Sequence, residues 1–349
     1  MSKSLKIGDL ELKVPVVQGG MGVGISLSGL AGNVSACGGL GVISTAQIGW
    51  REPDFYEKPF EANFRAIEKE INKARELAKG GVLGVNIMVA TQRYEEYVKS
   101  AVKAGIDIVI SGAGLPIDLP KYVEGSKTKI APIVSSLKSL TVICRMWERK
   151  YQTAPDLVVI EGPKAGGHLG FSREELETVT DEAYDDVIVS IIEKVKEYSE
   201  KFSKKIPVVV AGGIYERKDM EHVMKLGADG VQMGTRFVTT KECDADEAYK
   251  QSYIKAKKED IKIVQSPVGM PGRAILNPFL EKVKTEKCKI KHCYQCIVTC
   301  DKKTIPYCIT EALVNAAEGR VDEGLLFCGE NAYRADKIET VAEIMEEFR

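Results

Sequence analysis

The chain contains little histidine, almost no net charge and no long hydrophobic run. Only three histidines occur in 349 residues, and 49 basic residues are balanced by 50 acidic ones. This balance leaves no excess of positive charge for binding nucleic acid or anionic lipid. The apolar runs have the length of strands, whereas a helix that spans a bilayer needs about 20 apolar residues. We therefore expect neither a nucleic-acid partner nor a membrane.

The N-terminal stretch MSKSLKIGDLELKVP also lacks the apolar core of a secretory signal. A cytoplasmic location is the resulting expectation. The composition, 44% hydrophobic and 28% charged, is typical of globular proteins. The length allows one large domain or two of ordinary size. The expected partner is a small-molecule substrate.

Eight short, nearly continuous apolar runs alternate with amphipathic helical segments over about the first 245 residues. Strands covered on both faces have this character. The runs lie at 14–17, 40–43, 83–88, 106–111, 129–134, 157–161, 207–212 and 230–234. Their number and spacing predict a TIM (β/α)₈ barrel. A doubly wound sheet is the alternative, but no G-x-G-x-x-G sequence follows a strand.

The alternation stops after about residue 258. Residues 264–283 are rich in glycine and proline and predict loops, while the segment that follows Cys308 predicts a helix ending at Gly319. We therefore expect a barrel over 1–260 and a smaller, mainly helical C-terminal appendage with a cysteine cluster over 261–349.

Glycine-rich motifs stand where the predicted strands end. In a barrel these carboxyl ends carry the chemistry, and glycine lets the backbone approach a ligand closely. The sixth motif, EGPKAGGHLG, runs from Glu161 to Gly170 and contains His168. Two further motifs follow the seventh and eighth strands and carry Gly212, Gly213, Gly234 and Thr235. These loops predict a phosphate site, because glycine N–H groups and helix N-termini attract anions. The alternative is that the glycines only form tight turns.

Six of these motifs, taken together and in order, resemble one known family. They are QGGM at 18–21, GVNIM at 84–88, SGAG at 111–114, AGGH at 165–168, AGGI at 211–214 and QMGTRF at 232–237. The pattern is similar to that of the nitronate monooxygenases, with the FMN-dependent type II enoyl-acyl-carrier-protein reductases as close relatives. The resemblance covers roughly residues 10–280. It implies an FMN-binding TIM barrel with a smaller, mainly helical domain, and often a homodimer.

The resemblance also implies which residues contact FMN. They are Met21, Gly22, Asn86, Glu161, Gly166, Gly213, Gln232, Met233, Gly234 and Thr235. Two residues of the stretch EGPKAGGHLG, which follows the sixth predicted strand, depart from the nitronate monooxygenase pattern. Glu161 stands where many members have glutamine and is like the reductases in this respect, and Lys164 matches neither group.

His168 matches the histidine that the family places near flavin N5. Imidazole titrates near neutrality, so it can handle the proton that accompanies flavin chemistry. In its neutral form it can abstract the α-proton of a nitroalkane. In its protonated form it can hold an anionic nitro group or donate to an enolate oxygen. The alternative is a histidine that only caps a turn.

Three functions follow from this reading. The first is an FMN-dependent oxidoreductase, a nitronate monooxygenase that oxidatively denitrifies alkyl nitronates with His168 as the proton-handling residue. The second is an NAD(P)H-dependent flavin reductase that acts on enoyl thioesters or quinones. The third, of another class, is a flavin-binding redox sensor or electron relay.

Six of the nine cysteines crowd between Cys288 and Cys328. Four of them, Cys293, Cys296, Cys300 and Cys308, have the spacing C-x2-C-x3-C-x7-C. Thiolates at such spacing can bind Zn²⁺ or an iron–sulfur cluster. The resemblance does not assign this cluster, and reduced cysteines packed beside the barrel, or a disulfide formed on isolation, are the alternatives.

Overall fold

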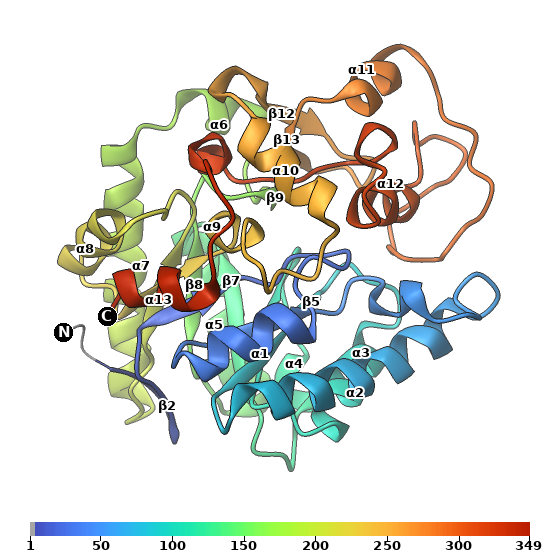
Figure 1. The fold of residues 1–349 in the computed structure, drawn as a ribbon. Helices are drawn as coiled ribbons and strands as arrows, with labels where there is room; N and C mark the ends of the chain where they lie inside the picture. Colours follow the sequence, from blue (N-terminus) through green and yellow to red (C-terminus); the bar gives the residue numbers. More distant parts are fainter. Residues whose placement is uncertain (1–3) are drawn as a thin grey trace.

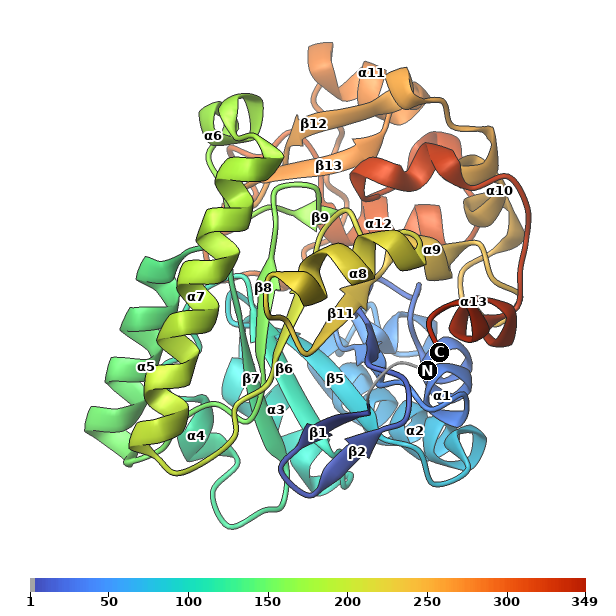
Figure 2. The same ribbon diagram turned by 90° about the vertical axis from the view of Figure 1, so that its left-hand side faces the viewer.

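The computed structural model describes residues 4–349 and contains a barrel of eight parallel strands (Figure 2). In sheet order these are β4 (Gly41–Ser44), β5 (Leu83–Met88), β6 (Ile108–Gly112), β7 (Lys129–Val134), β8 (Val158–Glu161), β10 (Val208–Ala211), β11 (Gly230–Met233) and β3 (Val16–Gln18). A bridge between Val17 and Leu40 closes the ring, with the Gln18 N–H donating to the Leu40 carbonyl at 2.9 Å. The predicted (β/α)₈ barrel is confirmed, and each predicted strand overlaps an observed one.

Helices surround the strands on the outside (Figure 1). They are α1 (Ser28–Ala36), α2 (Pro59–Ala78), α3 (Tyr94–Lys103), α4 (Leu119–Tyr122), α5 (Leu137–Tyr151), α7 (Asp181–Lys201), α8 (Arg217–Lys225) and α9 (Thr235–Val238). In α2, Pro59 occupies the first turn, and Ala66, Ile67, Ile71 and Ala74 bury one face. This apolar stripe packs the helix onto the strands and leaves its charged face in water.

A small hairpin, not foreseen from the sequence, closes the lower end of the barrel (Figure 2). It consists of β1 (Leu5–Ile7) and β2 (Leu10–Leu12), joined by a turn in which Gly8 has a φ of +61°. Leu5, Ile7 and Leu12 are buried and belong to the same apolar cluster as inward-facing strand residues. The hairpin therefore seals the end of the barrel opposite to the strand carboxyl ends.

The appendage lies over the carboxyl ends of the strands (Figures 1 and 2). Its elements are β12 (Ile261–Gln265), β13 (Pro271–Ile275), α11 (Pro278–Thr285), α12 (Ile309–Ala317) and the 3₁₀ segments Val321–Glu323 and Glu330–Arg334. The helix α10 (Glu247–Lys255) and the 3₁₀ segment Lys258–Asp260 lead into it from the barrel. The expectation of loops over 264–283 was wrong, because the glycines and prolines there form the turn and edges of an antiparallel hairpin. The predicted helix end at Gly319 is confirmed, since α12 stops at Ala317 and Gly319 has a φ of +87°.

The barrel and the appendage each contribute a short element that packs against the other. The strand β9 (Gly167–His168) leaves the sixth barrel loop, which continues into α6 (Arg173–Thr178), and pairs with β13 in a three-stranded antiparallel sheet. In the other direction, the final helix α13 (Val341–Glu347) packs against α1, and its Ile344 and Met345 join the barrel core. The division into 1–260 and 261–349 stays a prediction, made from sequence order. In the structure, β9 from the first range packs with the appendage, and α13 from the second range packs with the barrel. Within residues 4–349, no helix has both the length and the apolarity needed to cross a bilayer.

Candidate functional site

A cavity of ≈ 400 Å³ lies at the carboxyl ends of the barrel strands, under the appendage. The barrel loops contribute most of its wall, and Met270, Leu313 and residues 327–331 of the appendage complete it. All of the residues predicted to bind FMN, and His168, line this one cavity: Met21, Gly22, Asn86, Glu161, Gly166, Gly213, Gln232, Met233, Gly234 and Thr235. The sequence therefore located the cavity, while the role of each residue stays a prediction.

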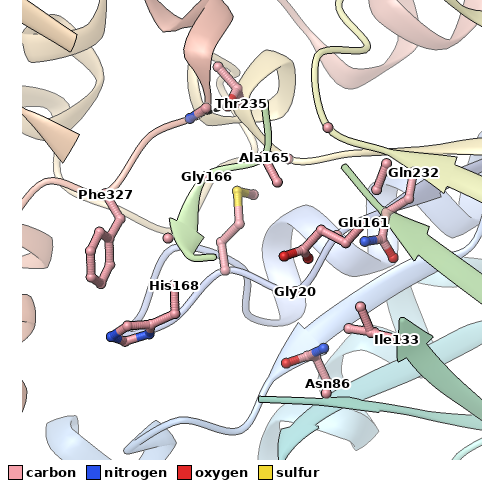
Figure 3. A pocket seen from close by; sticks show the side chains of 18 of the residues that line it. Gly20, Asn86, Ile133, Glu161, Ala165, Gly166, His168, Gln232, Thr235 and Phe327 are labelled. Atoms are coloured by element: carbon pink, nitrogen blue, oxygen red, sulfur yellow. Dashed lines mark hydrogen bonds between the residues drawn. The ribbon is translucent and has the colours of Figure 1, made fainter. Parts of the chain in front are cut away.

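His168 stands at one side of the cavity, near Phe327 of the appendage (Figure 3). Its Nε2 lies 2.7 Å from the Ser266 hydroxyl oxygen, and its ring meets Phe327 edge to face with centroids 4.9 Å apart. Burial lowers the pKa of His168 to about 4, because the imidazolium loses its hydration. The imidazole is therefore neutral at pH 7.

The appendage and the helix α10 that precedes it fix this side of the cavity. The hydroxyls of Tyr253 and Tyr249 both donate to the Phe327 carbonyl, at 2.6 and 3.2 Å. Ser266 lies in the turn between β12 and β13, where its N–H donates to the Met270 carbonyl at 3.0 Å. Neither Ser266 nor Phe327 was singled out from the sequence, because no motif marks them. The β9–β13 pairing brings the turn with Ser266 to His168, and a bridge between Ala274 of β13 and Phe327 brings Phe327.

Glu161 ends β8 and points into the same space as Asn86 (Figure 3). Burial raises the pKa of its carboxyl group to about 7. The strand end that carries it is fixed from outside, since the Tyr184 hydroxyl donates to the Glu161 carbonyl oxygen at 3.0 Å. A carboxyl group that changes charge near neutral pH thus lies within the cavity.

Glycines form one wall of the cavity. A Cβ at Gly20 would lie 2.4 Å from the Asn86 Cβ, and one at Gly22 would lie 2.7 Å from the Ser44 hydroxyl oxygen. No side chain fits at either position, so the backbone itself faces the cavity. This bare wall lets a planar ring approach the backbone closely.

Two glycines of the loop after β10 form the opposite end. Gly212 and Gly213 have φ values of +95° and +86°, which favour glycine, and the loop leads into the N-terminus of α8. The appendage holds this end in place. The Asn331 Nδ2 donates to the Gly213 carbonyl at 2.7 Å, and the Gly329 N–H donates to the Thr235 hydroxyl oxygen at 2.9 Å. Glycine loops beside a helix N-terminus are suited to phosphate.

The cysteine segment lies apart from these groups, along the outer loops of the barrel. The Gln92 N–H donates to the Cys296 carbonyl at 3.1 Å, and Tyr294 stacks on Phe55 with centroids 5.1 Å apart. All nine cysteines are free, and burial raises the thiol pKa of Cys296 and Cys300 and brings that of Cys308 to about 11. Across residues 4–349, no three histidine, cysteine or acidic side chains gather so as to hold a metal. The metal site predicted at Cys293, Cys296, Cys300 and Cys308 is therefore not supported.

Comparison with known proteins points to one family. The family model described as nitronate monooxygenase matches residues 3–349. A probable nitronate monooxygenase of Staphylococcus saprophyticus is 26% identical over 299 residues, which cover 79% of each chain. The structure of FabK from Thermotoga maritima superposes with a TM-score of 0.72 at 26% identity, covering 97% of this chain and 92% of the other. A nitroalkane oxidase from Streptomyces ansochromogenes has the same fold at 19% identity, with a TM-score of 0.72 and coverage of 97% and 95%.

The cavity fits the FMN that this family implies. Its ≈ 400 Å³ is within the range of small-molecule pockets, the bare glycine wall accepts a flat ring, and the left-handed glycines before α8 suit a phosphate. Met21, Gly22 and Asn86 would hold the ring, while Gly213, Gly234 and Thr235 would hold the phosphate. The chain belongs to the nitronate monooxygenase family and is an FMN-dependent oxidoreductase.

Proposed function

We propose that this protein is a nitronate monooxygenase, which oxidatively denitrifies alkyl nitronates, and that His168 removes the α-proton when the nitronate is formed in the cavity from a neutral nitroalkane. The observation that carries the proposal is the neutral imidazole of His168 at the side of the FMN cavity. A neutral imidazole is the form that accepts a proton, so abstraction of the α-proton of a nitroalkane is the role of His168 that is favoured. When bound, FMN supplies the capacity to accept electrons from the substrate and to react with O₂.

We infer that Nδ1 of His168 accepts the proton. When Nε2–H donates to the Ser266 hydroxyl, 2.7 Å away, Nδ1 carries the lone pair and is the proton acceptor. Protonation of this buried ring is unfavourable unless an anion lies beside it. The nitronate formed when a nitroalkane loses its α-proton is such an anion. His168 would thus take the proton and then stabilise the product of that transfer as an ion pair.

Apolar side chains in the cavity wall suit an alkyl chain. Met88, Leu115, Met270, Leu313 and Phe327 line the cavity and provide apolar contacts. These side chains would exclude water around the reacting carbon. We keep a cytoplasmic location and a homodimer as further predictions, which cell fractionation and size-exclusion chromatography test.

A reductase of enoyl thioesters or quinones, driven by NAD(P)H, is the second candidate. Two observations favour it. Glu161 stands where the reductases have glutamate, and FabK is 26% identical over nearly the whole chain. The cavity wall alone does not discriminate between the two reactions, since both need FMN and a proton-handling group.

Anaerobic mixing separates the two candidates. We expect an alkyl nitronate such as that of 2-nitropropane to bleach the flavin absorbance rapidly, and air to restore it with release of nitrite. Rapid bleaching by NADH or NADPH, with little effect of the nitronate, would instead establish the reductase. If neither reagent reduces the flavin, both enzymatic proposals fail and a flavin-binding sensor or relay remains.

A further inference from the structure

We propose that Lys164, the residue that departs from both family patterns, closes over the FMN phosphate by exchanging its present partner Asp181 for the phosphate. The inference concerns how this chain retains FMN. It does not depend on which substrate the enzyme oxidises, and its test needs no turnover.

The side chain of Lys164 lies against the loop that suits the phosphate. A Cβ on Gly213 would lie 3.2 Å from the Lys164 Cβ and 3.1 Å from its Cδ. The lysine stem therefore runs directly over Gly213, and Lys164 lines the same cavity. The ammonium group at the end of this stem is within one side-chain rotation of the space beside the glycine loop.

A phosphate beside Gly213 needs a positive charge nearby, and the cavity offers one residue that can supply it. Among the described residues that line it, Lys164 is the only cation, whereas Glu161 and Glu330 are acidic. A phosphate monoester carries about −1.5 to −2 charges at pH 7. Backbone N–H groups solvate a phosphate but do not neutralise it, and the lysine supplies the missing positive charge.

The present partner of Lys164 is easily exchanged. Its Nζ lies 2.6 Å from an Asp181 carboxylate oxygen, and the two side chains are 38% and 67% exposed. Ion pairs exposed to this extent contribute little to stability. A phosphate has up to twice the charge of this carboxylate and lies in a less hydrated place, so it competes effectively for the ammonium group.

Only the side chain has to move. The Lys164 carbonyl accepts a hydrogen bond from the Glu330 N–H at 3.1 Å, and the Ala165 N–H donates to the Gly162 carbonyl at 3.1 Å. The guanidinium of Arg273 also donates to the Ala165 carbonyl. The backbone around Lys164 is therefore fixed on both sides before the cofactor binds.

Comparing FMN with riboflavin tests the proposal, because riboflavin has the same ring and lacks the phosphate. The full-length protein, depleted of flavin, is titrated with each ligand and the quenching of flavin fluorescence is followed. We expect Lys164→Met to weaken FMN binding roughly 5- to 10-fold, as loss of a charge-assisted contact does, and to leave riboflavin binding unchanged. Lys164→Arg retains the charge and should bind FMN almost as the native chain does.

Two further variants complete the experiment. Lys218→Met removes the same charge from the start of α8, where the side chain is 76% exposed and pairs with Glu216, and should leave the affinity for both ligands unchanged. Asp181→Asn frees Lys164 and should tighten FMN binding about 2-fold, in line with a weak surface pair. Equal weakening of FMN and riboflavin binding by Lys164→Met would overturn the proposal, since the lysine would then only support the loop. Unchanged FMN binding in Lys164→Met would overturn it as well, and unchanged or weaker binding in Asp181→Asn would overturn the exchange.

Discussion

One end of the cavity consists mainly of backbone groups, whereas its other functional groups are side chains. At the end before α8, backbone groups dominate: Gly212 and Gly213 have left-handed conformations, and Asn331 and Gly329 hydrogen-bond the loops from above. Elsewhere in the cavity, side chains dominate, and burial moves the pKa of His168 to about 4 and that of Glu161 to about 7. The glycine end depends on conformation and the other groups depend on protonation.

This difference separates retention of the cofactor from the chemistry. Backbone N–H groups do not titrate, so the glycine end should hold a phosphate similarly at every pH at which the phosphate keeps the same charge. The desolvated side chains elsewhere in the cavity respond to pH and to any nearby charge. Substitutions at the glycine end and at these side chains should therefore change different measurements.

The largest effect is expected at His168. Replacing His168 with asparagine removes the proton acceptor and should lower kcat/KM for neutral nitroalkanes about 10²- to 10³-fold. Preformed nitronates need no proton abstraction, so their kcat/KM should fall far less. Steady-state assays with matched pairs of nitroalkane and nitronate measure this, and the flavin content should equal that of the native chain. An equal loss with both substrates would show that His168 does not act as the base.

Gly212→Ala tests the glycine end, and Gly80→Ala is the matched control variant. Both glycines have a positive φ, +95° and +86°, but a Cβ at Gly212 would lie 2.9 Å from the Gly162 carbonyl oxygen while Gly80 has open space. Alanine at Gly80 should cost about 1–2 kcal/mol of unfolding free energy and leave FMN bound. Alanine at Gly212 should cost about 1–3 kcal/mol more and weaken FMN binding at least about tenfold. Urea unfolding and flavin titration measure both, and equal behaviour of the two variants would contradict the argument.

A pH experiment isolates Glu161. The pKa of this carboxyl group is raised to about 7 in the folded chain from an ordinary 4.5, so the flavin-free protein should lose stability as pH rises through that interval. Glu161→Gln removes this pH dependence. The free energy of unfolding of the variant should exceed that of the native chain by about 1–3 kcal/mol at pH 8, and the difference should shrink toward pH 4. His168 acts with the opposite sign, because its lowered pKa makes stability fall as pH drops from about 6.5 to about 4.

Urea unfolding between pH 4 and 8 measures the Glu161 effect. Glu177→Gln, on an exposed helix surface, is the control and should show the pH dependence of the native chain. A Glu161→Gln curve parallel to the native one across this range would mean that the carboxyl group is not desolvated.

The smallest effect is expected at Asn331. Its Nδ2 holds the Gly213 carbonyl at 2.7 Å, so Asn331→Ala should loosen the glycine loop without touching His168. One neutral hydrogen bond contributes about 0.5–1.5 kcal/mol, which corresponds to a roughly 2- to 10-fold weaker affinity for FMN. Riboflavin and FMN titrations measure it. A changed pH profile of kcat/KM in this variant would show that the glycine end and His168 are coupled after all.

The barrel and its cavity were predictable because their signals are local. Strands covered on both faces must be apolar, and glycine must stand where a Cβ would collide, as at Gly20 and Gly22. These constraints act on neighbouring residues and leave a pattern that can be read along the chain. The flavin contacts themselves were implied by the resemblance to a family, and all of those residues line one cavity.

The cysteine segment shows the limit of local signals. The spacing of Cys293, Cys296 and Cys300 is compatible with a metal, but spacing does not bring side chains together. In the structure this segment instead docks on the barrel through backbone bonds to Ala90 and Gln92. Whether thiols converge depends on tertiary packing, which the spacing alone does not contain.

The sequence by itself determined the (β/α)₈ framework, the glycine wall and the position of His168 at a strand end. Only the tertiary structure decided what surrounds that histidine. Ser266 and Phe327 reach it from 98 and 159 residues further along the chain, because β9 pairs with β13 and Ala274 of β13 forms a bridge with Phe327. The low pKa of His168 and the neutral imidazole that follows from it come from this burial. Desolvation is a property of the whole packed neighbourhood, so no short stretch of sequence encodes it.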